Sequence, residues 1–232
     1  MSSEQKEKEV LETLKEIVKV KPKRTVLVGG YAINAYVLPR FSIDCDLVVL
    51  DDAKSIEKVL IQCGFKLVEE GNIPYGNYLR YGKGSSGEKI SFDLLIGSVY
   101  DRQSSVSFEK EIFKRYSKER ITVGRAVQIQ IKTRIADPEL LFAMKFVTAR
   151  RQDIRDIFML ASTRLNRSVV KSIVKTKLSY DLIKKRVRVI SEMVNSSTFR
   201  DSLQSAHGRL PESFIVTARK KLLKVLEDLK TD

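Results

Sequence analysis

Apolar and polar residues follow two different periods along the chain. Up to Ala136, short apolar runs and alternating segments typical of strands are interleaved with helical patterns, whereas from Asp137 onwards the spacing is helical throughout. Asp137 is a good helix N-cap, and Pro138 suits the first helical position. We therefore predict an α+β protein with a small mixed-sheet domain over residues 1–136 and a helical domain over residues 137–232.

The predicted first domain begins with an amphipathic helix, whose apolar face holds Val10, Leu11, Leu14, Ile17 and Val18. The strands predicted after it cover residues 25–29, 44–50, 66–69, 75–81 and 88–97, and the last two are joined by a hairpin loop at GKGSSG. Further helices are predicted at residues 30–38, 51–63 and 107–119, and a small hairpin pairs residues 121–123 with 126–131. The helical domain is expected to break around residues 207–211.

The composition is that expected of a protein outside membranes. The 232 residues are 43% hydrophobic, which is enough for a core, yet no apolar run approaches the roughly 18 residues of a membrane-spanning helix. The N-terminal segment is too charged for a signal peptide. The two cysteines, Cys45 and Cys63, fall in segments predicted to be buried, so free thiols in a reducing cytoplasm are expected.

The single histidine, His207, limits the chemistry that the chain can perform. A zinc site of the usual His and Cys composition cannot be assembled, and a Ser–His nucleophile would have to use this one residue. His207 precedes Gly208 in a polar stretch, so we predict that it lies on the surface, in a loop or at a helix end. Catalysis is therefore expected to depend on carboxylates and a metal ion.

The net charge of +14 is concentrated in the predicted helical domain. Residues 137–232 carry 20 Lys and Arg against 11 Asp and Glu, whereas residues 1–136 carry 23 against 18. One stripe, in which only Asp181 is acidic, contains Lys171, Lys175, Lys177, Lys184, Lys185, Arg186 and Arg188. Such a stripe is typical of a solvated helix face or of a surface that binds a polyanion by displacing counterions. The charge of the whole chain favours nucleic acid.

The strongest candidate chemistry lies in residues 25–50, TVLVGGYAINAYVLPRFSIDCDLVVL. Asp44 and Asp46 are one residue apart in a predicted strand, so their side chains project from the same face. Two adjacent carboxylates repel each other unless a cation lies between them. Gly29 and Gly30 form a turn that opens a helix, where backbone N–H groups can approach a phosphate closely. The pattern suggests a site that holds Mg²⁺ against nucleotide phosphates.

A third carboxylate, Asp93, lies in the apolar strand KISFDLLIG. Phe92 and Leu94 alternate onto one face, which places Asp93 on the other. Because an unpaired aspartate is costly to bury, Asp93 lies either at an exposed face or edge, or beside Asp44 and Asp46 on a neighbouring strand. In the second case it would hold a second cation and help to deprotonate an attacking hydroxyl.

The order of these motifs resembles the polymerase-beta-type nucleotidyltransferases. The shared pattern is an apolar-Gly-Gly turn, then Ser-x-Asp-x-Asp, then a strand with a lone aspartate. The later segment PELLFAMKFVTARRQDIRDIFML is similar to the lysine helix and the following Arg/Lys-Asp-x-x-Asp helix of the AbiEii-like branch, which includes the toxins of type IV toxin–antitoxin systems. The resemblance spans residues 25–160, with four separate blocks in the family's order.

In the first domain, the resemblance implies a role for each matched residue. Gly29, Gly30 and Ser42 would border the triphosphate of a bound nucleotide. Asp44 and Asp46 would ligate Mg²⁺ that bridges the phosphates, and two ions are expected in the site.

Three further residues are matched along the chain. Asp93 corresponds to the family's third, base-like carboxylate and second metal ligand. Lys145 corresponds to the lysine that contacts the triphosphate, and Asp156 to the trailing aspartate. Asp153 is the alternative for the trailing aspartate, because the spacing from the lysine is somewhat shorter here than the family's pattern leads us to expect.

The residues and the resemblance together predict a Mg²⁺-dependent nucleotidyltransferase. It would move an NMP from an NTP to a hydroxyl acceptor and release pyrophosphate. RNA, and tRNA in particular, is the expected acceptor, with a protein hydroxyl or a small molecule as alternatives, and the family's toxins imply an antitoxin protein as a partner. The competing hypothesis is a catalytically silent nucleotide- or RNA-binding module with the same fold.

Overall fold

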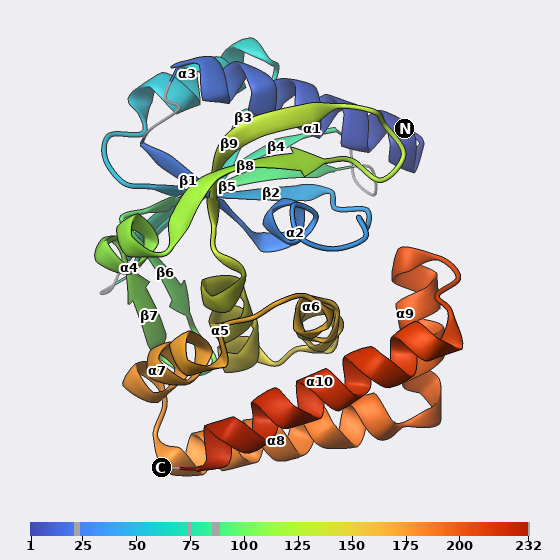
Figure 1. The fold of residues 1–232 in the computed structure, drawn as a ribbon. Helices are drawn as coiled ribbons and strands as arrows, with labels where there is room; N and C mark the ends of the chain where they lie inside the picture. The colour runs from blue at the N-terminus through green and yellow to red at the C-terminus, as the bar shows by residue number, and fades with distance from the viewer. Residues whose placement is uncertain (21–23, 74–75, 85–88, 232) are drawn as a thin grey trace. The chain divides into compact units, whose positions relative to one another are not determined.

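The structure, a computed structural model, describes residues 1–20, 24–73, 76–84 and 89–231 (Figure 1). The chain divides into two compact units: the first combines residues 1–35, 39–100 and 107–137, and the second combines residues 36–38, 101–106 and 138–232. A seven-stranded mixed sheet dominates the first unit, and helices dominate the second. The predicted α+β class is confirmed. In the described parts of the chain, no helix has the length and hydropathy of a membrane-spanning segment.

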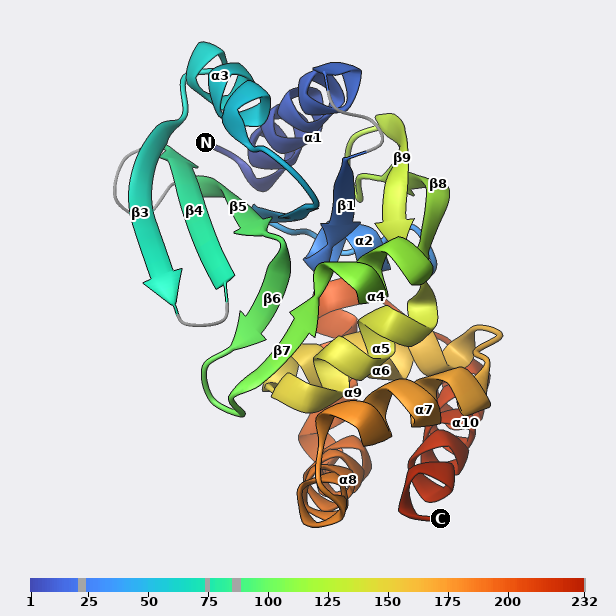
Figure 2. The same cartoon turned by 90° about the vertical axis from the view of Figure 1, so that its left-hand side faces the viewer.

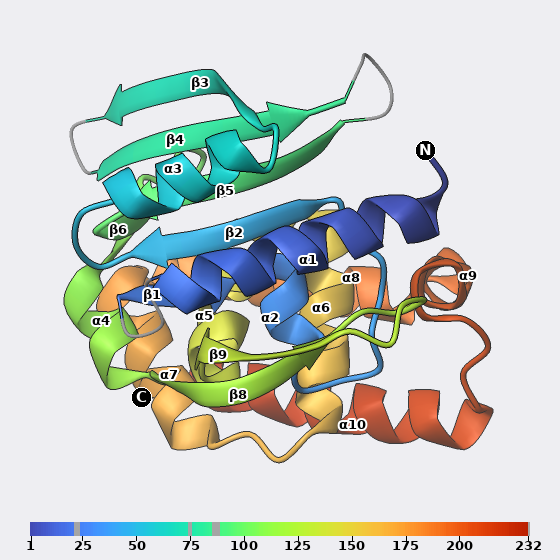
Figure 3. The ribbon, with the colours of Figure 1, turned by 90° about the horizontal axis from the view of Figure 1, so that it is seen from above.

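The sheet of the first unit has the strand order β3-β4-β5-β2-β1-β9-β8 (Figure 3). Its strands are β1 (Thr25–Val28), β2 (Asp44–Val49), β3 (Lys66–Ile73), β4 (Gly76–Lys83), β5 (Ile90–Ile96), β8 (Ser117–Val123) and β9 (Gln130–Ala136). β2 pairs with β5 in parallel, as β1 does with β9, and the other neighbouring pairs are antiparallel. β6 (Ser98–Asp101) and β7 (Val106–Glu109), which the sequence did not predict, form a separate pair. β2 therefore lies in the middle of the main sheet, between β1 and β5.

Helices α1 (Ser3–Val20) and α3 (Lys54–Gln62) cover one face of this sheet, and the short helix α2 (Gly29–Ile33) lies on the other face (Figure 1). Phe92 of β5 packs edge to face against Phe65, which follows α3, with ring centroids 5.2 Å apart. Tyr81 of β4 donates a hydrogen bond to Glu57 of α3 at 2.5 Å. Because side chains alternate along a strand, the residues next to Phe92 and Tyr81 project from the face that α1 and α3 leave open.

Glu7 attaches α1 to the connection between β8 and β9. Its buried carboxylate accepts backbone hydrogen bonds from Arg125 at 2.8 Å, from Ala126 at 2.7 Å and from Val127 at 3.2 Å. The predicted N-terminal helix is present, and its apolar face is buried as expected. The contacts of Glu7 show that a polar anchor adds to this apolar packing.

Six helices make up most of the second unit: α5 (Pro138–Thr148), α6 (Arg151–Ser162), α7 (Arg167–Lys177), α8 (Tyr180–Asn195), α9 (Ser197–His207) and α10 (Glu212–Lys230). The long helix α10 contacts α6, α7 and α8 (Figure 2). His207, predicted on the surface, is buried at the end of α9, where its Nδ1 lies 3.0 Å from the carbonyl oxygen of Leu38. The prediction was wrong because residues 36–38 pack with this unit, which the local pattern does not reveal.

Two predicted helices and one predicted hairpin differ most from the structure. The helix predicted at residues 30–38 ends at Ile33, because the side chain of Asn34 accepts a bond from the backbone N–H of Arg40 at 3.1 Å and donates one to its carbonyl at 2.9 Å. The helix predicted at residues 107–119 shrinks to α4 (Lys110–Arg115) between two strands. The second strand of the last hairpin begins at Gln130, since residues 125–127 bind Glu7 instead. Residues 85–88 of the predicted GKGSSG loop and its flank lie outside the described residues.

Candidate active site

Three aspartates lie side by side on two neighbouring strands of the first unit. In the parallel pair of β2 and β5, Asp46 is opposite Asp93 and Asp44 is opposite Ser91. Strand alternation places all three carboxylates on the face opposite to Phe92, away from α1 and α3. Asp93 is buried, Asp46 is half-buried and Asp44 is exposed. The second of the two placements considered for Asp93, beside the other two aspartates, is the one that the structure shows.

Ser91 and Cys45 are strand neighbours of this aspartate group, and they lie on opposite faces of the sheet. The hydroxyl of Ser91 donates a hydrogen bond to Oδ1 of Asp44 at 2.6 Å. Cys45 points to the opposite face and is fully buried. Burial, and then the negative charges of Asp46, Asp93 and Asp44, raise the pKa of the Cys45 thiol well above its usual value. The thiol is therefore neutral and packs as a small core side chain.

The two glycines of the β1–α2 turn lie directly against predicted site residues. Gly29 has φ of +66°, and a Cβ at this position would lie 1.8 Å from Oδ2 of Asp46. A Cβ on Gly30 would lie 2.7 Å from Oγ of Ser42. Glycine is therefore required at both positions, because any side chain would displace Asp46 or Ser42. The structure thus brings Gly29, Gly30 and Ser42 together with the aspartates of β2.

Tyr31 of α2 fixes the loop that carries Ser42. Its hydroxyl donates a hydrogen bond to the backbone carbonyl of Ser42 at 2.7 Å, and the hydroxyl of Ser42 donates one to the carbonyl of Asp44 at 3.0 Å. Burial is the main cause that raises the pKa of Tyr31 above its usual value, so its hydroxyl stays protonated as a donor. The side chain of Asn34 bonds to the backbone of Arg40 and so closes the same loop.

Arg80 of β4 is a site residue that the sequence reasoning missed. It lies opposite Asp93 in the antiparallel pair of β4 and β5. Its Nε donates to Oδ1 of Asp93 at 2.7 Å and its Nη2 donates to Oδ2 at 2.6 Å, so the guanidinium binds both carboxylate oxygens. These hydrogen bonds are the main cause that raises the pKa of Arg80 further above its usual value, so it stays charged. The register of the β4–β5 hairpin is the signal that could have revealed the pair. Lys83 lies opposite Ile90, and counting back along β4 while counting forward along β5 leads to Arg80 opposite Asp93.

The donors on β2 fit a hard divalent cation. Asp44 and Asp46 offer carboxylate oxygens from adjacent positions of one strand face, and these are the ligands that Mg²⁺ prefers. Both oxygens of Asp93 already accept hydrogen bonds from Arg80. Within the described residues, no three His, Cys, Asp or Glu side chains surround a common metal position. Asp44 and Asp46 could therefore share an ion, whereas Asp93 could join them only if Arg80 shifted.

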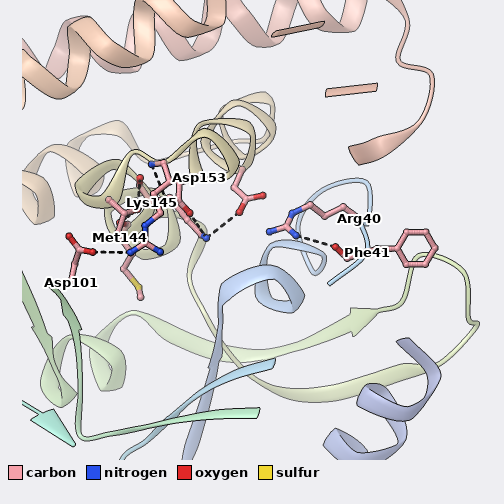
Figure 4. Close-up of polar contacts among 9 residues, drawn as sticks. Arg40, Phe41, Asp101, Met144, Lys145 and Asp153 are labelled. Carbon is pink, nitrogen blue, oxygen red and sulfur yellow. Dashed lines mark hydrogen bonds and ion pairs between the residues drawn. The ribbon is translucent and has the colours of Figure 1, made fainter. Parts of the chain in front are cut away.

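Lys145, Asp153 and Asp156 form an ion cluster within the helical unit. Nζ of Lys145 lies 2.7 Å from Oδ1 of Asp153 (Figure 4). It also lies 3.3 Å from Oδ2 of Asp156. Asp153 also accepts hydrogen bonds from Oγ1 of Thr148 at 2.7 Å and from the backbone N–H of Arg150 at 3.2 Å. Asp156 is fully buried, and the Lys145 side chain is 18% exposed. Lys145 is thus no ordinary surface lysine, and both candidate aspartates contact it.

The roles of Lys145 and Asp156 in nucleotide binding stay predictions. Both residues belong to the second unit, whereas Asp44, Asp46 and Asp93 belong to the first. Their contacts with each other account for their burial without any ligand.

A glycine turn, an aspartate pair and a third aspartate on the paired strand occur together in this mixed sheet, as the resemblance to polymerase-beta-type nucleotidyltransferases implied. The chain belongs to the AbiEii family, since residues 14–215 match the family model of the nucleotidyl transferase AbiEii toxin of type IV toxin–antitoxin systems. The predicted family is thereby confirmed.

Comparison with solved structures finds the crystal structure of JHP933 from Helicobacter pylori. It is 15% identical to this chain with a TM-score of 0.47, over 94% of this chain and 91% of that one. No curated protein matches this chain.

Proposed function

We propose that this chain is a Mg²⁺-dependent nucleotidyltransferase that moves an NMP from an NTP to a hydroxyl of RNA, with tRNA as the expected acceptor. One observation carries the proposal: Asp44, Asp46 and Asp93 share a face of two paired strands, beside the turn formed by Gly29 and Gly30. Membership of the AbiEii family supports nucleotidyl transfer as the reaction class.

The residues of β2 and of the glycine turn would bind the nucleotide. Asp44 and Asp46 would hold Mg²⁺, which when bound supplies positive charge against the triphosphate. Gly29 and Gly30 bring the backbone of the turn close to Asp46 and Ser42, so its N–H groups are suited to border phosphate oxygens bound beside these residues. Ser42 lies against the same turn and is suited to the same role.

Asp93 would accept the proton of the attacking hydroxyl. In this step the acceptor oxygen forms a bond to the α-phosphorus, the bond to the bridging oxygen breaks, and pyrophosphate leaves with that electron pair. The two hydrogen bonds from Arg80 hold the carboxylate of Asp93 in one orientation, and the proton would go to a lone pair that Arg80 leaves unused. The second ion expected from the resemblance would have to compete with Arg80 for Asp93.

The charge of the chain supports a polyanionic acceptor. Residues 137–232 contain 20 Lys and Arg against 11 Asp and Glu, and a positive surface attracts the phosphates of RNA. The type IV toxin–antitoxin family also leads us to expect an antitoxin protein as a partner.

The test is the transfer of label from each of four α-labelled NTPs, in the presence of Mg²⁺, to total tRNA or to protein. The Asp44→Ala/Asp46→Ala variant is the control. Label on RNA that disappears in this variant would support the proposal, and label on protein alone would replace RNA with a polypeptide acceptor. Label on RNA that persists in the variant would refute the assigned site.

A silent nucleotide-binding module is the second candidate function, and the pair of Arg80 and Asp93 favours it. Because Arg80 engages both oxygens of Asp93, the third carboxylate is already satisfied without a substrate. Mg²⁺-dependent NTP binding without transfer to any RNA or protein fraction would support the silent module against the enzyme.

A further inference from the structure

Four cationic side chains line a hollow within the helical unit. The hollow has a volume of about 300 Å³, and its cations are Arg164, Arg167, Lys221 and Lys224. They come from two segments that are distant in the sequence, the connection between α6 and α7 and the middle of α10, which contacts both helices. No acidic residue of the described chain lines the hollow.

Two of the four cations are held in place by contacts with the protein. Nζ of Lys221 donates a hydrogen bond to the carbonyl of Ser162, at the end of α6, at 2.8 Å. Nη1 of Arg167, the first residue of α7, pairs with Oδ2 of Asp228 on α10 at 2.5 Å. These contacts join the walls of the hollow, so its shape exists before a ligand arrives.

The other two cations are available to a ligand. Arg164 and Lys224 are exposed, and neither forms a hydrogen bond or ion pair with any described residue. Leu165 and Val225 also line the hollow. Since like charges gathered around one space repel each other, an anion in the hollow would relieve this repulsion.

Two further cations, Lys171 and Lys175, lie along the seam between α7 and α10, beyond the pair of Arg167 and Asp228. Arg167, Lys171 and Lys175 are spaced four residues apart on α7, so they lie on one face of the helix. Lys171 donates to Oγ1 of Thr231 at 3.1 Å and Lys175 to its carbonyl at 2.8 Å, so this face borders the C-terminal end of α10. A line of cations longer than the hollow suits a polymeric anion rather than a single small one.

We propose that this hollow, with the seam beside it, binds the phosphodiester backbone of the RNA acceptor. The proposal rests on the proposed function for the choice of RNA. It shares Lys171 and Lys175 with the basic stripe seen in the sequence, but it leaves out the cations of that stripe that lie on α8. Lys184, Lys185, Arg186 and Arg188 of that stripe lie on α8, whereas the hollow is built from the start of α7 and from α10.

The test compares two double substitutions that remove the same charge from the same unit. Arg164→Gln/Lys224→Gln changes the hollow, and Lys185→Gln/Arg188→Gln changes exposed cations on α8. Binding of unfractionated tRNA is measured by fluorescence anisotropy without NTP at several salt concentrations. We expect the hollow variant to bind about tenfold more weakly and to lower the salt slope by about 1 to 2, and the α8 variant to lose less than about threefold. Equal losses, or no loss in the hollow variant, would overturn the proposal.

Further measurements distinguish a failure of this proposal from a failure of the proposed function. Asp44→Ala/Asp46→Ala is expected to bind tRNA as the unmodified chain does and to transfer no label. If the unmodified chain bound tRNA but transferred no label to RNA or protein, the enzyme would be refuted and the hollow would stand. Failure of the unmodified chain to bind tRNA would overturn the hollow, while label transfer to protein would still test the enzyme. If the hollow variant lost MgATP binding instead, the hollow would be a nucleotide site. If poly-glutamate displaced tRNA as well as unlabelled tRNA does, the partner would be an acidic protein. An unchanged thermal midpoint checks that both variants fold.

Discussion

The aspartates on the sheet of the first unit and those on α6 in the second unit have different kinds of partners. On α6, Asp153 and Asp156 both lie within 3.3 Å of the ammonium of Lys145, and Asp153 accepts two further hydrogen bonds. On the sheet, Arg80 binds Asp93 and, more distantly, Glu69, while Asp44 accepts a hydrogen bond from the neutral hydroxyl of Ser91. The α6 cluster is satisfied by the protein itself and is expected to stabilise it, whereas the sheet leaves carboxylates suited to an added cation.

The largest effect is expected when the aspartate pair on β2 is changed. Asp46→Asn keeps the shape of the side chain but removes its charge, so label transfer should fall on the order of a thousandfold while the thermal midpoint stays unchanged. Asp51→Asn, which alters an exposed aspartate of the same unit, is the matched control and should keep full activity. Unchanged label transfer in Asp46→Asn would contradict the functional role assigned to the sheet aspartates, and with it the contrast with the α6 cluster.

The opposite pattern is expected for the cluster on α6. Asp153→Ala removes one partner of a buried ion pair and leaves the Arg150 N–H without its acceptor, so the free energy of unfolding should fall by about 3 kcal/mol. Urea denaturation measures the change. Asp44→Ala, at an exposed position, should cost less than about 1 kcal/mol. Similar losses for the two variants would contradict the structural role assigned to the α6 cluster.

Arg80 tests whether the sheet group needs a fixed cation. Arg80→Gln should lower label transfer by roughly tenfold to a hundredfold, because Asp93 loses both hydrogen bonds that orient it. Arg80→Lys should recover only part of the loss, since an ammonium cannot donate in the same two-pronged geometry.

A second measurement on Arg80 does not depend on activity. Titration with Mn²⁺, followed by electron paramagnetic resonance, should show tighter or additional binding in Arg80→Gln, because Asp93 becomes available as a ligand. Identical Mn²⁺ binding in both proteins would show that Arg80 does not restrict access to Asp93.

Tyr31 makes a smaller contribution to the stability of the first unit, and this contribution depends on pH. Its pKa is raised in the folded protein by burial, so the folded state holds this proton more tightly than the unfolded state does. The stabilisation is complete below the usual tyrosine pKa of about 10 and decreases as the pH rises above it, with a slope approaching about 1.4 kcal/mol per pH unit. Tyr31→Phe should remove this part of the alkaline loss, measured as unfolding free energy from pH 9 to 11. Tyr180→Phe, at an exposed tyrosine, should leave the slope unchanged.

The smallest expected effect concerns the connection between α5, which carries Lys145, and α6, which carries Asp153 and Asp156. Ala149 joins α5 to α6 with φ of +48°, a conformation that is strained for alanine. Ala149→Gly should stabilise the protein by about 0.5 kcal/mol, because glycine adopts this conformation without strain. Ala143→Gly, in the interior of α5, should instead destabilise it by about 1 kcal/mol. A loss of stability in Ala149→Gly would show that the buried methyl group outweighs the strain.

Much of the sheet side of the candidate site could be predicted from local sequence. Asp44 and Asp46 share a face because side chains alternate along any strand. The apolar run around Asp93 indicated a strand, and a position beside Asp44 and Asp46 was one of the two placements considered for it. The glycine turn was only a weak signal, because its meaning depends on the side chains of Asp46 and Ser42 that approach it.

The partners of charged residues were harder to predict. Arg80 was overlooked because its role follows from the register of a hairpin rather than from its neighbours in the chain. The ion pairs of Lys145 were not predicted, since the local pattern does not reveal that α6 folds back to bring Asp153 and Asp156 to it.

The sequence by itself determined the fold class, the family and the faces on which the three sheet carboxylates lie, because these depend on periodicity and on short motifs within single elements. Only the tertiary structure decided that Arg80 binds Asp93, that His207 is buried, and that α10 meets the start of α7 around a positive hollow. Those arrangements join segments that are distant along the chain. They are set by hairpin register and helix packing, whose energy depends on both partners at once.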